Sequence, residues 1–139
     1  MHKLNGVRAV IFPASNIKAS ITAWTDILGY PPAYQTPDFA AFLDGDIEIG
    51  LSRLAWVDQP LVLWKVEDIE EAHRLLVATG ARAMVEGASG LMVEFGTTEI
   101  ANGDPATGIV DVPGRRLAVL KSADGNLIGI LQDMPTAWS

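Results

Sequence analysis

The chain of 139 residues contains no cysteine. This absence excludes disulfide bonds, thiolate nucleophiles and thiolate metal ligands together. The apolar runs are as short as strands, and none reaches the roughly 20 residues that a membrane-spanning helix needs. The start of the chain also lacks the basic and apolar regions of an export signal. We therefore expect a cytoplasmic protein that does not enter a membrane.

Basic residues are scarce as well. The chain has 10 lysines and arginines against 17 aspartates and glutamates, which gives a net charge of −7. The basic residues are scattered, and only Arg115 and Arg116 are adjacent. Such a balance repels phosphate backbones, so we expect no nucleic-acid partner. The negative charge mildly favours cationic small molecules, although its simpler role is to keep a small protein in solution.

The sequence does contain one pattern that occurs twice. Residues 7–53 and residues 61–132 each begin with an apolar strand, continue with an amphipathic helix and end with short strands around an Asp-Gly turn. This order predicts an α+β fold in which two tandem βαβββ modules form a curled mixed sheet around a central groove. No flexible linker separates the halves, so we expect a single domain over residues 1–139. Module 1 would span about residues 6–54 and module 2 about residues 60–133.

The helices have clear boundary signals. Asn16 and Asp68 can cap the two helices at their N-termini, and Gly29 and Gly80 can end them. We expect helices over residues 16–28 and 68–79, and strands over residues 7–13, 33–36, 39–44, 47–53, 61–66, 81–86, 115–121 and 127–132. The glycine-rich segment 87–108 is either an additional strand or a lid.

Three stretches carry motifs in a specific order. Residues 23–30 (Ala-Trp-Thr-Asp-Ile-Leu-Gly-Tyr) end the first predicted helix. Residues 64–72 lead from a strand into the second predicted helix, and residues 114–132 form a closing hairpin around Asp-Gly-Asn. Through these stretches and their spacing the chain resembles the vicinal oxygen chelate superfamily, which includes glyoxalases, bleomycin-resistance proteins and dioxygenases. The resemblance implies a homodimer, because many members with two modules pair so that their grooves lie at or near the interface.

The resemblance also indicates where metal-dependent members hold a divalent ion. Their histidine, glutamine or glutamate ligands project from the first and last strands of each module and leave positions for substrate oxygens. The matching positions in this chain are Ala9, Leu61, Gly129 and a position within residues 48–50. Among them only Glu48 could coordinate. His2 precedes the first strand, and His73 is expected to be solvated, so we expect no metal centre and no cofactor.

A groove without metal ligands would recognise molecules by shape and by contact with aromatic rings. Because side chains alternate along a strand, Lys65 should face the groove while Trp64 packs under the second helix. Trp56 lies in the crossing between the halves. It either contacts the groove or a dimer partner, or it covers the core. Arg115 and Arg116 are interpreted as a solvated pair. The candidate ligand-binding residues are Trp56, Phe42, Tyr34, Glu48, Lys65, Arg53, Met92 and Glu94.

No catalytic constellation emerges, because no serine stands at a motif spacing from a histidine and no nucleophile elbow occurs. The leading interpretation is therefore metal-independent binding of a small organic molecule, aromatic or cationic, similar to sequestration by bleomycin-resistance proteins. The alternative is a lyase, isomerase or dioxygenase-like enzyme of the same superfamily that uses a displaced metal or acid/base residues. A third interpretation is an accessory protein whose groove is filled by its own side chains.

Overall fold

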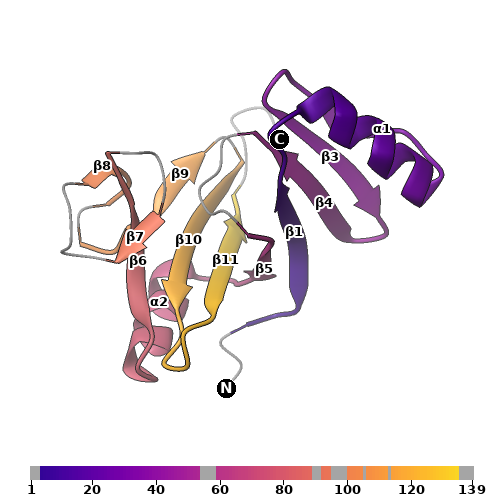
Figure 1. The fold of residues 1–139 in the computed structure, drawn as a ribbon. Coiled ribbons are helices and arrows are strands. Elements are labelled where there is room, and N and C mark those ends of the chain that lie inside the picture. Colours follow the sequence, from indigo (N-terminus) through magenta and orange to yellow (C-terminus); the bar gives the residue numbers. More distant parts are fainter. Residues whose placement is uncertain are drawn as a thin grey trace.

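The computed structural model describes residues 4–53, 59–88, 92–94, 100–104, 106–112 and 114–134. These residues form two helices and eleven strands (Figure 1). In chain order the elements are β1 (Val7–Pro13), α1 (Ile17–Leu28), β2 (Tyr34–Gln35), β3 (Phe39–Asp44), β4 (Ile47–Ser52), β5 (Leu61–Lys65), α2 (Ile69–Ala78), β6 (Arg82–Gly87), β7 (Met92–Glu94), β8 (Ile100–Asn102), β9 (Val110–Val112), β10 (Arg115–Lys121) and β11 (Leu127–Asp133). Within these ranges no helix is long and apolar enough to cross a membrane.

The strands form one mixed sheet in the order β2-β3-β4-β1-β5-β11-β10-β6-β7, with β8 beside β6 and β9 beside β10. β1 runs parallel to β4, and β5 runs parallel to β11, so the two halves have the same internal order. The halves meet edge to edge where β1 pairs with β5 in antiparallel direction (Figure 1). The predicted α+β fold with its repeated βαβββ order is confirmed.

The second half carries additional short strands. β7 and β8 both pair with β6, and β9 pairs with β10. Without these three strands the second half consists of β5, α2, β6, β10 and β11, which repeats the order of the first half. Of the two expectations for segment 87–108, its described residues support additional strands.

The helix α1 begins and ends at the residues that the sequence indicates. The Asn16 side chain accepts a hydrogen bond from the Ala19 backbone N–H at 3.1 Å, which satisfies one of the free donors at the helix start. Gly29 takes a left-handed conformation with φ of 86°, and its N–H donates to the Thr25 carbonyl at 2.8 Å. Both boundary predictions for this helix are confirmed.

The helix α2 is fixed to the sheet by a cap and by a longer-range hydrogen bond. The Asp68 carboxylate accepts hydrogen bonds from the backbone N–H groups of Glu70 and Glu71 at 3.1 and 3.2 Å. The Gln132 side chain on β11 accepts a further bond from the Ile69 N–H at 2.9 Å. Three donors of the first turn are therefore satisfied, and one of the acceptors belongs to the sheet.

Both helices cover the same face of the sheet. Ala9 and Leu63 are direct partners in the β1–β5 pairing and share one face, so Phe12 and Trp64 share the other. On this second face α1 covers one apolar cluster and α2 covers another. The α1 cluster contains Ala14, Ile17, Ala40, Phe42 and Leu51, and the α2 cluster contains Val66, Ile69, Ala72, Leu76, Ala81, Ile109, Ala118, Leu120 and Ile130.

The opposite face, which we call the concave face, carries Ala9 and Leu63 and faces neither α1 nor α2. On this face Glu48 of β4 contacts Arg115 of β10, with an Oε2–Nη1 distance of 3.3 Å. In a flat sheet these strands would lie four spacings apart, roughly 19 Å at about 4.8 Å each. The sheet must therefore curl toward this face (Figure 1).

The prediction that His73 is solvated is wrong. His73 is only 6% exposed, because residues of the segment between β8 and β9 pack against that side of α2. Burial lowers the pKa of the imidazole, and the Thr107 backbone and the charge of Asp104 only partly oppose this effect. Among the residues that the structure describes, the Nε2 atom of His73 has no hydrogen-bond partner.

Candidate functional site

One row of residues crosses the concave face where the halves join. Glu48 of β4 lies opposite Ala9 of β1, Ala9 lies opposite Leu63 of β5, and Leu63 lies opposite Gly129 of β11. This row contains the positions matched to metal ligands in the sequence analysis, except that Leu61 was matched there. In the structure Leu63 pairs with Gly129 as Ala9 pairs with Glu48, so Leu63 is the equivalent position of the second half. A shift of two residues keeps a side chain on the same face, so alternation alone could not separate the two.

Leu63 closes the space at one end of the row. A Cβ atom at Gly129 would lie 2.8 Å from Leu63 Cγ and 2.9 Å from the Val62 carbonyl oxygen, which is closer than van der Waals contact allows. The leucine thus occupies the volume that a metal ligand at position 129 would need. From here across the second half, the concave face is filled by an apolar cluster of Ala9, Leu61, Leu63, Met84, Met92, Val119 and Leu131, with Ile11, Leu117 and Leu127 packed against it.

The concave face remains open over the first half and beside Val112 and Arg115 of the second half, where it forms a cavity of about 640 Å³. This volume lies within the range of pockets that accept small organic molecules. Apolar side chains at its wall are exposed, Tyr34 by 59%, Leu43 by 52% and Val112 by 37%. The cavity is lined by Ala9, Ile11, Ala33, Tyr34, Phe39, Ala41, Leu43, Glu48, Leu63, Val112, Arg115, Leu117 and Leu131.

Small residues leave room for this cavity. Ala9 and Ala41 line it without filling it. Gly50 of β4 pairs with Ile11 on one side and Ala41 on the other, at the same level of the sheet. A Cβ atom at Gly50 would lie 3.0 Å from Phe39 Cζ, so the glycine allows the phenyl ring to approach the backbone of β4 closely.

Glu48 and Arg115 supply the charged groups of the cavity. The Arg115 Nη1 atom donates to Glu48 Oε2 at 3.3 Å, and the two side chains are 23% and 15% exposed. Arg115 Nη2 also lies 3.8 Å from Asp133 Oδ1, and Asp133 Oδ2 lies 3.6 Å from Arg8 Nε. These four residues, which we call the charge network, connect strands β4, β10, β11 and β1. The carboxylate of Glu48 is therefore already neutralised by a guanidinium group.

Three of the eight predicted ligand-binding residues lie beside this open space. Tyr34 and Glu48 line the cavity itself. Lys65 lies on the same face, as alternation predicts, but lines a neighbouring polar hollow that the cavity meets at Leu43. Trp56 lies outside the described residues.

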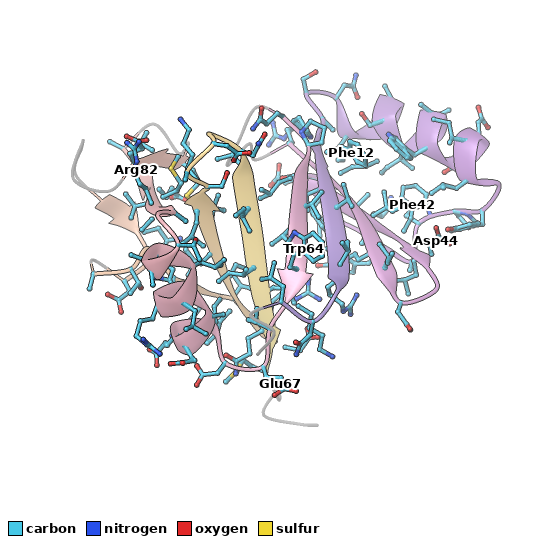
Figure 2. The ribbon with its side chains drawn as sticks, turned by 90° about the horizontal axis from the view of Figure 1, so that it is seen from below. Phe12, Phe42, Asp44, Trp64, Glu67 and Arg82 are labelled. Atoms are coloured by element: carbon cyan, nitrogen blue, oxygen red, sulfur yellow. The ribbon has the colours of Figure 1, made fainter. Side chains whose placement is uncertain are left out.

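Two predicted residues are buried instead. Phe42 points toward α1 and is 0% exposed, with its ring centroid 6.4 Å from that of Tyr30 (Figure 2). Met92 is 8% exposed and belongs to the apolar cluster that fills the second half of the concave face. Their prediction as walls of the open groove is corrected, because in both cases neighbouring side chains already cover the residue.

Two predicted charged residues lie elsewhere on the surface. Arg53 forms an ion pair with Asp38, where β3 begins and β4 ends, and does not line the cavity. Glu94 lies on the concave face but at its far edge, with Oε1 3.3 Å from Arg82 Nη1. The filled cluster separates Glu94 from the cavity, so both predictions are corrected.

Sequence reasoning missed Phe39 and Arg115. The signal for Phe39 was present, because the Asp44-Gly45 turn sets Leu43 opposite Glu48 and alternation then places Phe39 on the same face. Arg115 carried no comparable signal, because its contact with Glu48 joins residues 67 positions apart across the curl of the sheet. Its interpretation as a solvated residue is wrong.

Comparison with known proteins places this geometry in a structural context. No protein-family model matches the sequence, and no curated protein matches it. Among solved structures, methylmalonyl-CoA epimerase from Mycobacterium tuberculosis has a TM-score of 0.64 at 17% identity, with 97% of this chain and 92% of that chain covered. A glyoxalase/bleomycin resistance protein/dioxygenase superfamily member from Vibrio splendidus 12B01 has a TM-score of 0.55 at 18% identity, with 92% and 99% covered.

The chain has the vicinal oxygen chelate fold. A third similar structure is described as NAD-dependent benzaldehyde dehydrogenase from Legionella pneumophila, with a TM-score of 0.61 at 14% identity, covering 91% of this chain and 98% of that chain. At these identities the similarity establishes the fold and not the activity. The different functions named for these structures make the same point.

The row Glu48–Ala9–Leu63–Gly129 does not suit the metal centre that metal-dependent proteins of the vicinal oxygen chelate fold hold. Only Glu48 offers a ligand atom, and that carboxylate is bound to Arg115. Within the described ranges, no group of three or more histidine, aspartate or glutamate side chains stands close enough together to hold an ion. The donor set of the row therefore does not fit a divalent ion.

Proposed function

We propose that the protein binds a small organic molecule in the cavity of the first half, without a metal ion. The observation that carries this proposal is the open volume of about 640 Å³ with a largely apolar lining, next to the part of the concave face that an apolar cluster fills. Tyr34 and Phe39 add rings that can contact a planar or aliphatic body. Binding of this kind requires no catalytic group.

The electrostatics of the lining do not favour a cation. Glu48 is the carboxylate among the described lining residues, and its ion pair with Arg115 compensates its charge. A cationic ligand would have to displace the guanidinium or share the carboxylate with it. The proposal therefore depends on the apolar body of the ligand and not on a positive charge.

A test of this proposal replaces an exposed apolar residue by aspartate in two variants, one at the cavity and one away from it. Leu43 is 52% exposed in the cavity wall, and Ile27 is 68% exposed on α1, away from the cavity. A panel of uncharged aromatic and aliphatic compounds is screened by thermal shift and by chemical-shift perturbation of backbone amides. We expect compounds that bind the native protein to lose affinity in Leu43→Asp and to keep it in Ile27→Asp.

If no compound binds, or if both variants bind equally well, the cavity is not the binding site.

The alternative function is a lyase, isomerase or dioxygenase-like enzyme with a displaced metal or with acid/base residues. Glu48, the ionisable carboxylate at the cavity, is the residue that favours it. A stoichiometric divalent ion that copurifies with the protein and is lost in Glu48→Gln would favour the enzyme over the binder.

Two further expectations belong to the same proposal. We expect the protein to form a homodimer, which size-exclusion chromatography with light scattering measures directly. The exposed apolar residues Tyr34, Leu43 and Val112 around the cavity would support such pairing, because a second chain could cover them. We also expect a cytoplasmic location, in line with the absence of cysteine from the chain.

A further inference from the structure

A second hollow adjoins the cavity on the concave face. Its volume is about 670 Å³, and Leu43 lies at the boundary between the two. It is lined by Asn5, Val7, Arg8, Leu43, Gly45, Asp46, Lys65 and Asp133. The two hollows follow one another along the strands, since Val7 precedes Ala9 on β1 and Leu131 precedes Asp133 on β11. Together they form a trough with an apolar part and a polar part.

Most cations among the described residues form ion pairs. Arg8, Arg53, Arg74, Arg82, Arg115, Arg116 and Lys121 each lie within 4.0 Å of a carboxylate oxygen. In the part of the chain that the structure describes, only Lys18 and Lys65 take part in no ion pair. Lys18 lies on the exposed side of α1, whereas Lys65 lines the polar hollow.

The backbone places Lys65 beside the apolar cavity. In the β5–β11 pairing Lys65 is the direct partner of Leu131, and Leu131 lines the cavity. A molecule with its apolar body against Leu43, the residue that both hollows share, would therefore hold its end group near the lysine. A compact, rotatable ammonium group of this kind binds an anion as a point charge.

We infer that the ligand of this protein is an amphiphilic organic anion, whose apolar body occupies the cavity and whose carboxylate pairs with Lys65. This inference rests on the proposed function and adds to it the end group of the ligand and the residue that recognises it. The charge network lies between the two hollows and needs no rearrangement, because Asp133 already has Arg8 and Arg115 as partners.

One negative charge in the hollow opposes such a ligand. The Asp46 side chain has no ion-pair partner within the described ranges, and Arg8 Nη1 donates to its backbone carbonyl at 3.1 Å rather than to its carboxylate. Asp46 is exposed on the turn between β3 and β4, where water and salt weaken its field. Removal of the Asp46 charge should therefore strengthen the binding of an anion, which gives a second test of the inference.

The experiment compares three probes with one apolar body, namely 4-phenylbutyrate, 4-phenylbutanol and 4-phenylbutylammonium. Dissociation constants are measured by chemical-shift perturbation for the native protein, Lys65→Met, Lys65→Arg and the control Lys18→Met. We expect the carboxylate to bind about fivefold more tightly than the alcohol, as a partly exposed charge pair allows. Lys65→Met should abolish this difference, and Lys65→Arg and Lys18→Met should retain it. Asp46→Asn should increase the affinity for the carboxylate.

The outcomes separate the inference from the proposed function. Equal binding of the carboxylate and the alcohol, or an unchanged preference in Lys65→Met, overturns the inference and leaves the proposed function standing. Tighter binding of the ammonium probe overturns the inference. If none of the three probes binds at millimolar concentration, the inference fails, and the compound panel described above then decides the proposed function.

Discussion

Among the ion pairs of the described residues, the pair between Glu48 and Arg115 should be the most strongly coupled, because its two side chains are the most buried. It connects β4 of the first half to β10 of the second half across three intervening strands. Because the pair spans the curl of the sheet, removing either partner changes more than a local contact. A double-mutant cycle with Glu48→Gln and Arg115→Met measures this coupling.

The magnitude follows from the burial of the pair. Exposed ion pairs contribute about 0.2–1 kcal/mol, and removal of one partner from a fully buried pair costs about 3–5 kcal/mol. The side chains of Arg115 and Glu48 are 23% and 15% exposed, which places them between these limits. We expect a coupling energy of about 1–2 kcal/mol. Arg115→Met should be the more harmful single change, because it leaves the largely buried carboxylate of Glu48 without its partner.

The control is the pair Arg74–Glu71 on α2. Its N–O distance is 2.6 Å, shorter than the 3.3 Å of the cavity pair, but its side chains are 66% and 44% exposed. A cycle with Glu71→Gln and Arg74→Met should give a clearly smaller coupling, because water screens this exposed pair. Unfolding in urea at low and at high salt gives both energies. A cavity-pair coupling no larger than that of the helix pair would refute the reasoning, because burial would then not outweigh distance.

Three further changes test other parts of the structure. Because burial lowers the pKa of the His73 imidazole, the unfolded chain binds one more proton below about pH 6.5, and the native protein should lose stability as the pH falls. His73→Leu should remove this loss. Urea unfolding between pH 5 and 8 measures it, and an equal pH dependence of the unfolding free energy in both proteins would contradict it. Gly129→Ala should destabilise the protein by about 1–3 kcal/mol through overpacking, more than Gly50→Ala. The new Cβ at position 129 would meet backbone as well as a side chain, whereas the Cβ at position 50 would meet a ring that can move into the cavity. Similar thermal unfolding midpoints for the two variants would contradict this. Asp68→Ala should cost about 1 kcal/mol through loss of the α2 cap, and an unchanged midpoint would mean that the sheet alone holds the helix start.

The fold was predictable because its signals are local. Asn16 and Asp68 cap the helices, Gly29 ends the first of them, and the Asp-Gly turns define the hairpins. Each signal acts over a few residues, and the same order occurs in both halves. The register between β5 and its neighbours was not local, which is why Leu61 was assigned a position that belongs to Leu63.

The site was less predictable because it depends on which parts of the concave face are covered. Alternation could place a residue on that face, as it did for Lys65, but not tell an open position from a filled one. Met92 shares the face with Tyr34, yet neighbouring side chains bury Met92 and leave Tyr34 exposed. His73 was misjudged for the same reason, since the segment that covers it follows α2 by many residues. Coverage is a property of tertiary packing, and a single sequence carries no direct signal for it.

The missing metal ligands and the filled half of the groove have a common origin in the row at the join. Leu63 and Gly129 fit each other, because the leucine side chain occupies the space above the glycine. A ligand at either position would therefore require a change at the other. At the opposite end of the row Ala9 leaves room, and Glu48 turns to Arg115 instead of an ion. An apolar cluster thus fills most of the second half of the concave face, and the cavity occupies the first half and extends to Val112 and Arg115 of the second.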